Sequence, residues 1–220
     1  MLFPRKQAED DTVVEMLASA LRRDISFGVL RPDEKLKIEA LRQRYGGSNH
    51  SMRETLRTLV AEGMVEATNQ RGFRVTSATE EDLRDILSMR MEIEKLGLAW
   101  SLTQGGVEWE ASVIAAQHQL AHAEAAVQTN PDDVTALQWD EACRMFAITL
   151  ISACGSPRLI EMAGRFYDQS RRFRLAQLRE GRIDFAARAA RRENLKNATV
   201  ARDEQAALKL LEEDIRADLT

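Results

Sequence analysis

Residues 46–75 constrain the fold more than any other part of the chain. This stretch, GGSNHSMRETLRTLVAEGMVEATNQRGFRV, begins with a Gly-Gly turn, continues as an amphipathic run and ends with two short alternating runs around a Gly-containing turn. Such a pattern predicts a helix followed by a β-hairpin. The buried stripe of the helix is predicted to consist of Met52, Leu56, Leu59, Val60 and Met64.

Two further helices are predicted before this stretch. Apolar residues recur at helical spacing over residues 12–27, and Gly28 follows as a stop. RPDEKL then supplies a turn, and a short second helix carries Ile38, Leu41 and Tyr45 up to the Gly-Gly pair. Two short helices joined by a tight turn, with a small polar residue opening the second, are the sequence form of a helix-turn-helix. The hairpin makes it a winged helix.

The third helix carries the side chains expected to reach DNA. Ser48 or its neighbours are expected to accept its free amide protons, and Arg53 and Arg57 lie one turn apart on a face away from the core stripe. A hairpin tipped by Arg71 and Gly72 would reach into a minor groove. Two alternatives stay open, since the first-turn residues can be mere caps and an arginine can be a solvated charge. The candidate DNA-binding residues are Ser48, Asn49, His50, Arg53, Arg57, Arg71 and Gly72.

Composition and charge favour two domains, one of them basic. Apolar residues make up 44% of the 220-residue chain and aromatic residues 5%, which favours helix over an aromatic-rich sheet. The net charge is −4, yet residues 22–74 hold eleven Lys and Arg against seven Asp and Glu. A basic module joined to an acidic one suits a polyanion binder with a second domain. We expect a DNA-binding domain over 1–77 and a second domain over 78–220.

Beyond residue 77 the sequence predicts only helices. Six are expected, with boundaries marked by capping patterns, by Asn130 with Pro131 and by Ser156 with Pro157. They are predicted at about 79–102, 108–128, 131–155, 157–180, 185–200 and 204–219. The predicted fold class is therefore mainly α, an N-terminal winged helix-turn-helix with a small β-hairpin and a C-terminal all-α helical bundle.

The cysteines and the apolar runs bear on the compartment. Cys143 and Cys154 are expected in one helix, separated by roughly 16 Å of rise, which is too far for a disulfide. Both are therefore interpreted as free thiols in a reducing compartment. No apolar run approaches the length of a membrane span, and the first residues do not resemble a signal peptide. A cytoplasmic protein with no membrane partner is expected.

The order of these parts resembles the GntR family of bacterial transcription regulators, and specifically its FadR-like branch with an all-helical FCD ligand-binding domain. MRETLRTLVAEGMV matches the family's V-R-E-A-L-x-x-L-x-x-E-G-L-V, and NQRGFRV matches its wing. The resemblance implies a homodimeric DNA-binding protein that responds to a small effector. One departure concerns base reading, because Asn49 stands where the family usually has an arginine. Altered operator preference or weaker binding is therefore expected.

The second domain resembles the family at its effector site but departs from it in the metal ligands. SMRMEIEKLGLAWSL resembles the R-x-x-L-E opening, which makes Arg90 a candidate anion contact. Many members hold a metal with an Asp and three His, and the matching positions here are Cys143, Ala147, Arg192 and Asp214. A two-residue slip would put Asn194 in place of Arg192. We therefore expect no metal and no other cofactor, with Arg192 pairing with Asp214 or with a ligand carboxylate.

The candidate effector-binding residues are Arg90, Cys143, Arg192 and Asp214, and the resemblance implies an organic acid or an acyl conjugate as effector. His118 and His122 have the spacing of a zinc pair, but no partner is visible and a helix surface is the simpler interpretation. Trp100, Trp109 and Trp139 are expected in packing. No catalytic triad or carboxylate pair is apparent, so no enzyme is predicted. The competing hypothesis is a small-molecule sensor or interaction protein that has lost specific DNA recognition.

Overall fold

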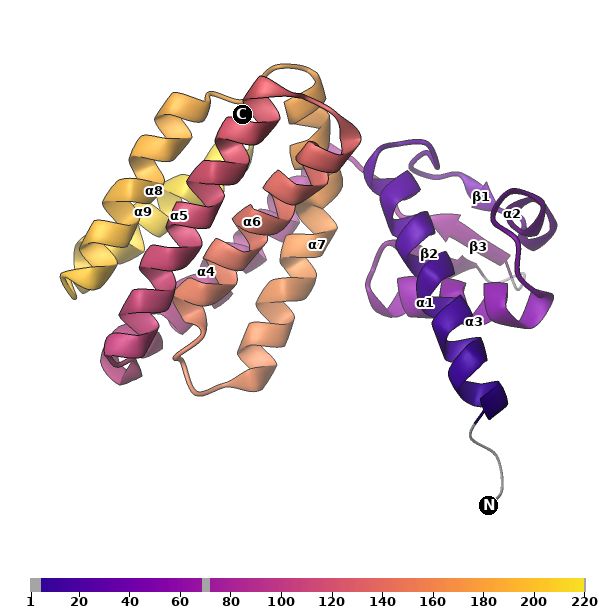
Figure 1. The fold of residues 1–220 in the computed structure, drawn as a ribbon, viewed down its shortest axis with the longest axis horizontal. Coiled ribbons are helices and arrows are strands. Elements are labelled where there is room, and N and C mark those ends of the chain that lie inside the picture. Colours follow the sequence, from indigo (N-terminus) through magenta and orange to yellow (C-terminus); the bar gives the residue numbers. More distant parts are fainter. Residues whose placement is uncertain (1–4, 69–71, 220) are drawn as a thin grey trace. The chain divides into compact units, whose positions relative to one another are not determined.

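The computed structural model describes residues 5–68 and 72–219. The chain divides into two compact units, Met1–Asp82 and Leu83–Thr220 (Figure 1). The domain boundary expected from the sequence, between residues 77 and 78, lies within the first unit and stays a prediction.

The first unit is a winged helix-turn-helix. The three strands form one antiparallel sheet of order β1-β3-β2, in which Val65 lies opposite Val75 and Thr68 opposite Gly72. The predicted fold of this unit is thus confirmed. Its elements are α1 (Arg5–Ser26), β1 (Lys35–Leu36), α2 (Ile38–Tyr45), α3 (Asn49–Ala61), β2 (Val65–Thr68) and β3 (Gly72–Val75).

Two elements of this unit differ from the prediction. Helix α1 begins at Arg5 rather than at residue 12, because its first turns are polar and apolar periodicity does not mark them. RPDEKL, expected as a turn alone, also contains β1. Val75 pairs with the start of this segment, since its carbonyl accepts from the Asp33 amide at 3.1 Å and its amide donates to the Glu34 carbonyl at 3.0 Å. A two-residue strand is too short to show an alternating pattern.

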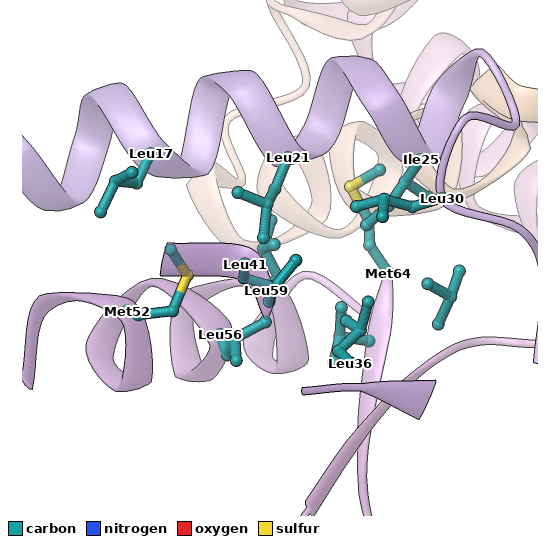
Figure 2. Close-up of a cluster of buried hydrophobic side chains, with 12 residues drawn as sticks. Leu17, Leu21, Ile25, Leu30, Leu36, Leu41, Met52, Leu56, Leu59 and Met64 are labelled. Carbon is teal, nitrogen blue, oxygen red and sulfur yellow. The ribbon is translucent and has the colours of Figure 1, made fainter. Parts of the chain in front are cut away.

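One apolar core holds the first unit together (Figure 2). Helix α1 contributes Leu17, Leu21 and Ile25, which pack against the buried stripe of α3. Of the five residues predicted for that stripe, Met52, Leu56 and Leu59 are fully buried and Val60 is partly buried against the cluster. Met64 is also buried in this core, but it lies beyond the end of α3 at Ala61 and is not part of the helix, which corrects the prediction. Burial of a Leu or Met side chain stabilises a fold by about 1.5 to 3 kcal/mol. This contact therefore sets which face of α3 remains for solvent.

The second unit is a bundle of helices, as predicted. Helix α5 packs against α6 and α8, α6 also against α7, and α8 against α9 (Figure 1). In the part of the chain that the structure describes, no helix is long and apolar enough to cross a bilayer. The elements of the second unit are α4 (Glu80–Gln104), α5 (Val107–Thr129), α6 (Asp133–Ile151), α7 (Pro157–Arg179), α8 (Phe185–Val200), α9 (Glu204–Arg216) and the 3-10 turn η1 (Ala217–Leu219).

The limits of α6 correct two expectations. Asp132, rather than Asn130 with Pro131, is its N-cap, and it forms a capping box with Thr135. The helix ends at Ile151, so Cys143 lies within it and Cys154 in the turn that follows. Gly155 closes this turn at a φ of +71°, a backbone conformation that favours glycine. Both cysteines are free and buried, as predicted.

The tryptophans divide between core and surface. Trp139 is fully buried and Trp109 nearly so, and the indole N–H of Trp109 donates to the Thr149 carbonyl at 2.8 Å. Trp100 is 40% exposed, so its expected place in packing is only partly correct. Helix α4, which carries Trp100, has apolar side chains outside the face that packs in the bundle as well as on it.

Candidate nucleic-acid interface and buried cavity

The N-terminus of α3 is closed by two serines. The Ser48 hydroxyl accepts from the Ser51 amide at 3.0 Å, and the Ser51 hydroxyl accepts from the Ser48 amide at 2.9 Å. Ser51 is buried, a capping role that the sequence prediction missed. Gly47, which precedes them, has a φ of +82°, and a Cβ there would lie 2.9 Å from Leu17 Cδ1. The positive φ favours glycine at this position, and a larger residue would also press on the end of the Leu17 side chain.

Three predicted DNA-binding residues stand on the open face of α3. Asn49, His50 and Arg53 are exposed, on the side away from the core stripe. Arg53 makes no ion pair with any described residue, whereas the guanidinium of Arg57 pairs with the Glu54 carboxylate on the same helix. Arg53 is thus the more available of the two cations for an anionic partner.

Helix α2 adds a cation that the sequence prediction did not single out. Arg42 Nη1 donates to Asn49 Oδ1 at 3.3 Å, and Arg42 Nε donates to the Gly47 carbonyl at 3.3 Å. These bonds hold the turn between α2 and α3 and orient the Asn49 amide. Asn49 is therefore a positioned side chain as well as an exposed one.

The wing is described in part. Arg71 lies outside the described residues, and Gly72 begins β3, where a Cβ would lie 3.0 Å from the Thr68 hydroxyl. Lys35 of β1 pairs in register with Arg74 of β3, so two cations lie side by side at the base of the wing. Lys35, like Lys37 after it, is exposed. The basic excess of this region was the only sequence signal for these lysines.

Ion pairs connect α1 to both helices of the helix-turn-helix. Arg22 donates to the two carboxylate oxygens of Glu62, at the end of α3, at 2.8 Å each. The buried Asp24 carboxylate accepts from Arg44 at 2.9 Å and from the Tyr45 hydroxyl at 2.5 Å, both at the end of α2. Bidentate and charge-assisted bonds of this kind fix orientation as well as adding stability. The three helices are thereby held in one arrangement.

In the second unit, the four predicted effector-binding residues line one small cavity of about 20 Å³. They come from four helices, with Arg90 on α4, Cys143 on α6, Arg192 on α8 and Asp214 on α9. Asn194, the alternative to Arg192, is exposed. The helices therefore bring the four residues together, and their role in binding stays a prediction. The other lining residues are Glu94, Phe146, Ala147, Leu150, Tyr167, Leu195, Leu211, Ile215 and Asp218.

The buried guanidinium of Arg192 has three partners. Nη1 donates to Glu124 Oε1 at 2.6 Å, Nη2 to Cys143 Sγ at 3.4 Å and Nε to Asp214 Oδ2 at 3.5 Å. Glu124 was missed by the sequence prediction, because it lies on α5 with no motif around it. Burial raises the pKa of the Glu124 carboxyl more than the charge of Arg192 lowers it.

The same region is poorly suited to a metal ion. Burial raises the pKa of the Cys143 thiol to about 11, so without a metal the thiol is protonated at neutral pH. Among residues 5–68 and 72–219, no cluster of three His, Cys, Asp or Glu side chains could hold a metal. His118 and His122 are exposed on α5. That Arg192 takes the place of the family's metal ion stays a prediction from the family resemblance.

A second set of charges surrounds Arg90. Its Nε donates to Glu94 Oε1 at 2.7 Å and its Nη1 to Asp218 Oδ2 at 3.2 Å. Its guanidinium also lies 4.4 Å from the centre of the Tyr167 ring, and that of Arg174 lies 3.8 Å from it. Burial raises the pKa of Tyr167 well above its ordinary value, so the phenol is neutral. The cavity wall is therefore a network of paired charges around a neutral aromatic ring.

Comparisons with known proteins agree with this architecture. Residues 13–75 match the family described as bacterial regulatory proteins, gntR family, and residues 85–217 match the FCD domain. The chain resembles the solved structure of E. coli McbR/YncC with a TM-score of 0.70 and 20% identity, over 93% of this chain and 94% of that one. It resembles a GntR transcriptional regulator from Rhodococcus sp. RHA1 with a TM-score of 0.71 and 21% identity, over 94% and 95%. At these identities the likeness shows the fold alone.

Two relatives in sequence extend the comparison. The chain is 36% identical over 159 residues to the HTH-type transcriptional repressor GlaR of Escherichia coli (strain K12), covering 72% of this chain and 71% of that protein. It is 33% identical over 211 residues to the HTH-type transcriptional regulator BphR of Paraburkholderia xenovorans (strain LB400), covering 95% and 84%. The chain therefore belongs to the gntR family of bacterial transcription regulators, in the branch that carries an FCD domain.

Proposed function

We propose that the chain acts as a homodimer in the cytoplasm and binds a double-stranded DNA operator through α3. A small carboxylate effector in the cavity of the second unit sets the affinity of the dimer for DNA. The effector class, an organic acid or an acyl conjugate, follows from the family resemblance and from the guanidinium groups of the cavity.

The exposed guanidinium of Arg53 carries the DNA-binding proposal. It lies one turn into α3, past an N-terminus whose small side chains allow close approach to phosphate. An arginine free of carboxylate partners keeps its donors for a base edge or a phosphate, and a bidentate contact with guanine discriminates by about 1 to 3 kcal/mol. Asn49 and His50 share this face and can hydrogen-bond bases. Arg57, already paired with Glu54, is the weaker contact.

A two-fold dimer follows from the reach of one recognition helix. Helix α3 has 13 residues, and only its first turns enter a major groove in this type of motif. Few bases are read by one copy, so useful affinity needs two copies on a pseudo-palindromic site.

Arg90 and Arg192 are the proposed contacts for the carboxylate of the effector. Both guanidinium groups are buried on the cavity wall, and each is neutralised by carboxylates of the chain. A ligand carboxylate would exchange with one of these internal partners. Coupling to DNA affinity requires only that the ligand bind one arrangement of the dimer better, by about 1 to 3 kcal/mol.

Titration onto the DNA upstream of its own gene tests the proposal. We expect a specific complex whose affinity falls steeply with salt, since each neutralised phosphate releases counterions. Equal and weak binding to every sequence would instead favour the competing function, a sensor that has lost operator recognition. The observation that favours this competitor is Asn49 at the position where the family usually has a base-reading arginine.

Elemental analysis of the purified protein tests the metal-free cavity. We expect no stoichiometric zinc or nickel, because Arg192 fills the cation position. A metal present at one ion per chain would contradict this part of the proposal and leave the DNA-binding part untouched.

A further inference from the structure

Asp218 is a buried aspartate whose carboxylate lies close to two arginines. It lies in the 3-10 turn η1, directly after α9, and is only 5% exposed. Its Oδ2 accepts from Arg90 at 3.2 Å, and its Oδ1 lies 2.9 Å from Arg188 Nη2. The second contact lacks hydrogen-bond geometry, so among the described residues Oδ1 accepts no hydrogen bond. The carboxylate thus sits between two guanidinium groups with spare acceptor capacity.

The backbone of the turn is held by the same surroundings. Gln177 Nε2 donates to the Asp218 carbonyl at 2.9 Å, and Arg188 Nη2 donates to the Ala217 carbonyl at 3.3 Å. Burial alone would raise the pKa of Asp218, but Arg188, Arg174, Arg90 and Arg192 together lower it below its ordinary value. The side chain is therefore a carboxylate anion at neutral pH.

Asp218 differs from the other carboxylates of the cavity wall in its support. Glu94 and Asp214 project from within α-helices, which can withdraw them only by unfolding or by moving a whole helix. Asp218 is carried by three residues of 3-10 turn. A single 3-10 turn has few backbone hydrogen bonds to break, so it opens at lower free energy than a packed α-helix does. It is therefore the carboxylate of this wall that is most easily withdrawn.

The cavity itself requires such a movement. Its volume of about 20 Å³ is enough for roughly one water molecule and too small for an organic acid. A ligand can enter only if part of the wall leaves. Removing Asp218 alone would leave Arg90 and Arg188 buried without this counter-charge, which is costly. A carboxylate that takes its place restores the charge balance, so the exchange replaces like with like.

We propose that Asp218 is an internal pseudo-ligand: its carboxylate occupies a site formed by the guanidinium groups of Arg90 and Arg188, and an incoming small carboxylate displaces it together with the turn η1. This inference rests on the proposed function, in which an effector binds in the cavity. It names Asp218 as the residue that competes with the effector for that site. The turn then reports occupancy, since it is packed when the site holds Asp218 and released when it holds a ligand.

Chemical rescue tests the proposal with acetate as the probe. In the full chain, Asp218→Ala removes the internal carboxylate and leaves a space of its size. Thermal unfolding is followed in sodium acetate and in sodium chloride at equal ionic strength and pH 7. Acetate at about five times its dissociation constant should raise the midpoint of this variant by about 2 to 4 °C above the value in chloride.

Glu212→Ala provides the matched control. Glu212 lies six residues before Asp218, on α9, and it too is paired with two cations, but its partners Lys95 and Arg216 lie outside the cavity wall. This variant and the unchanged chain should respond equally to acetate and to chloride. An acetate response of Asp218→Ala no larger than that of Glu212→Ala would overturn the proposal.

A second variant covers the case in which Asp218→Ala fails to fold. Asp218→Asn keeps the side-chain volume and loses the charge, so it competes less well with acetate. Hydrogen exchange of the amides of residues 215–219 should become several-fold faster in acetate than in chloride, while α7 stays unchanged. Equal exchange in both salts would also overturn the proposal. Neither experiment involves DNA, so failure here is distinguishable from failure of the operator titration.

Discussion

Arg53 on α3 and Arg174 on α7 carry the same charged group into opposite surroundings. Arg53 is exposed and unpaired among the described residues, whereas Arg174 is only 1% exposed and donates to Asp140 Oδ1 at 3.0 and 2.8 Å. The first guanidinium keeps its donors for a partner outside the chain. The second uses its donors for hydrogen bonds inside the protein, where an unpaired charge would cost several kcal/mol. Charge count alone cannot separate a binding surface from a structural network; burial and pairing can.

The largest expected effect is on stability. Arg174→Met leaves the buried Asp140 carboxylate with Arg171 as its remaining partner, and should destabilise the second unit by about 3 to 5 kcal/mol. Urea unfolding monitored by the fluorescence of the buried Trp139 measures this. Arg165→Met is the control, since among residues 5–68 and 72–219 Arg165 pairs only with the exposed Glu161, and the change should cost at most about 1 kcal/mol. Equal costs would erase the contrast between the two kinds of arginine.

The next effect is on DNA binding. Arg53→Ala should weaken operator binding by about 1 to 3 kcal/mol, roughly 5- to 150-fold, and leave the unfolding midpoint unchanged. The slope of affinity against salt should also fall by about 1 if the contact is to phosphate. Fluorescence anisotropy with labelled operator DNA gives both values. Arg57→Ala should lose less, because its guanidinium already pairs with Glu54; a larger loss for Arg57 would reverse our assignment.

A smaller effect is expected at the start of α3. Ser48→Ala removes the hydroxyl that accepts from the Ser51 amide and should destabilise the first unit by about 1 kcal/mol. Thermal unfolding of the full chain measures it. Ser112→Ala, on the exposed face of α5, should change stability by less than about 0.5 kcal/mol. If both substitutions are neutral, the cap does not support the recognition helix.

The last effect is on acid stability and is confined to low pH. Because the folded protein lowers the pKa of Asp218, this group stabilises the fold above the ordinary aspartate pKa, and the contribution is lost as pH falls below about 4. Asp218→Asn should make the loss of stability over that range shallower, by at most about 1.4 kcal/mol per pH unit. Urea unfolding at pH values from 6 to 3 measures the slope. Parallel curves for the two proteins would show that Asp218 does not titrate differently on folding.

Much of the fold follows from patterns that are local in the sequence. Apolar periodicity predicts the core stripe of α3 and the helices of the second unit, and membership of a regulator family confirms that the chain is no enzyme. Strand β1 is missed because two residues show no period. Helix α1 is predicted too short because polar first turns carry no apolar signal.

The candidate sites divide along the same line. Arg53 is predicted on an open face because spacing along one helix defines that face. The family resemblance alone predicts that one site contains Arg90, Cys143, Arg192 and Asp214. Spacing in the sequence does not predict this, because the four residues come from four helices. Glu124 and Asp218 escape prediction altogether, because their partners are 68 and 128 residues away in the sequence. Contacts over such separations depend on packing that no local pattern records.

The ties between Arg22 and Glu62, and between Asp24 and the end of α2, have a mechanical consequence. A force applied to α1 cannot slide this helix over the other two without breaking a bidentate bridge or a buried carboxylate cluster. These contacts therefore favour movement of the three helices as one rigid body. In a dimer, a rigid-body movement of this kind would alter the separation of the two winged helix-turn-helix units along the duplex. The contacts of each unit with its own half-site would stay the same.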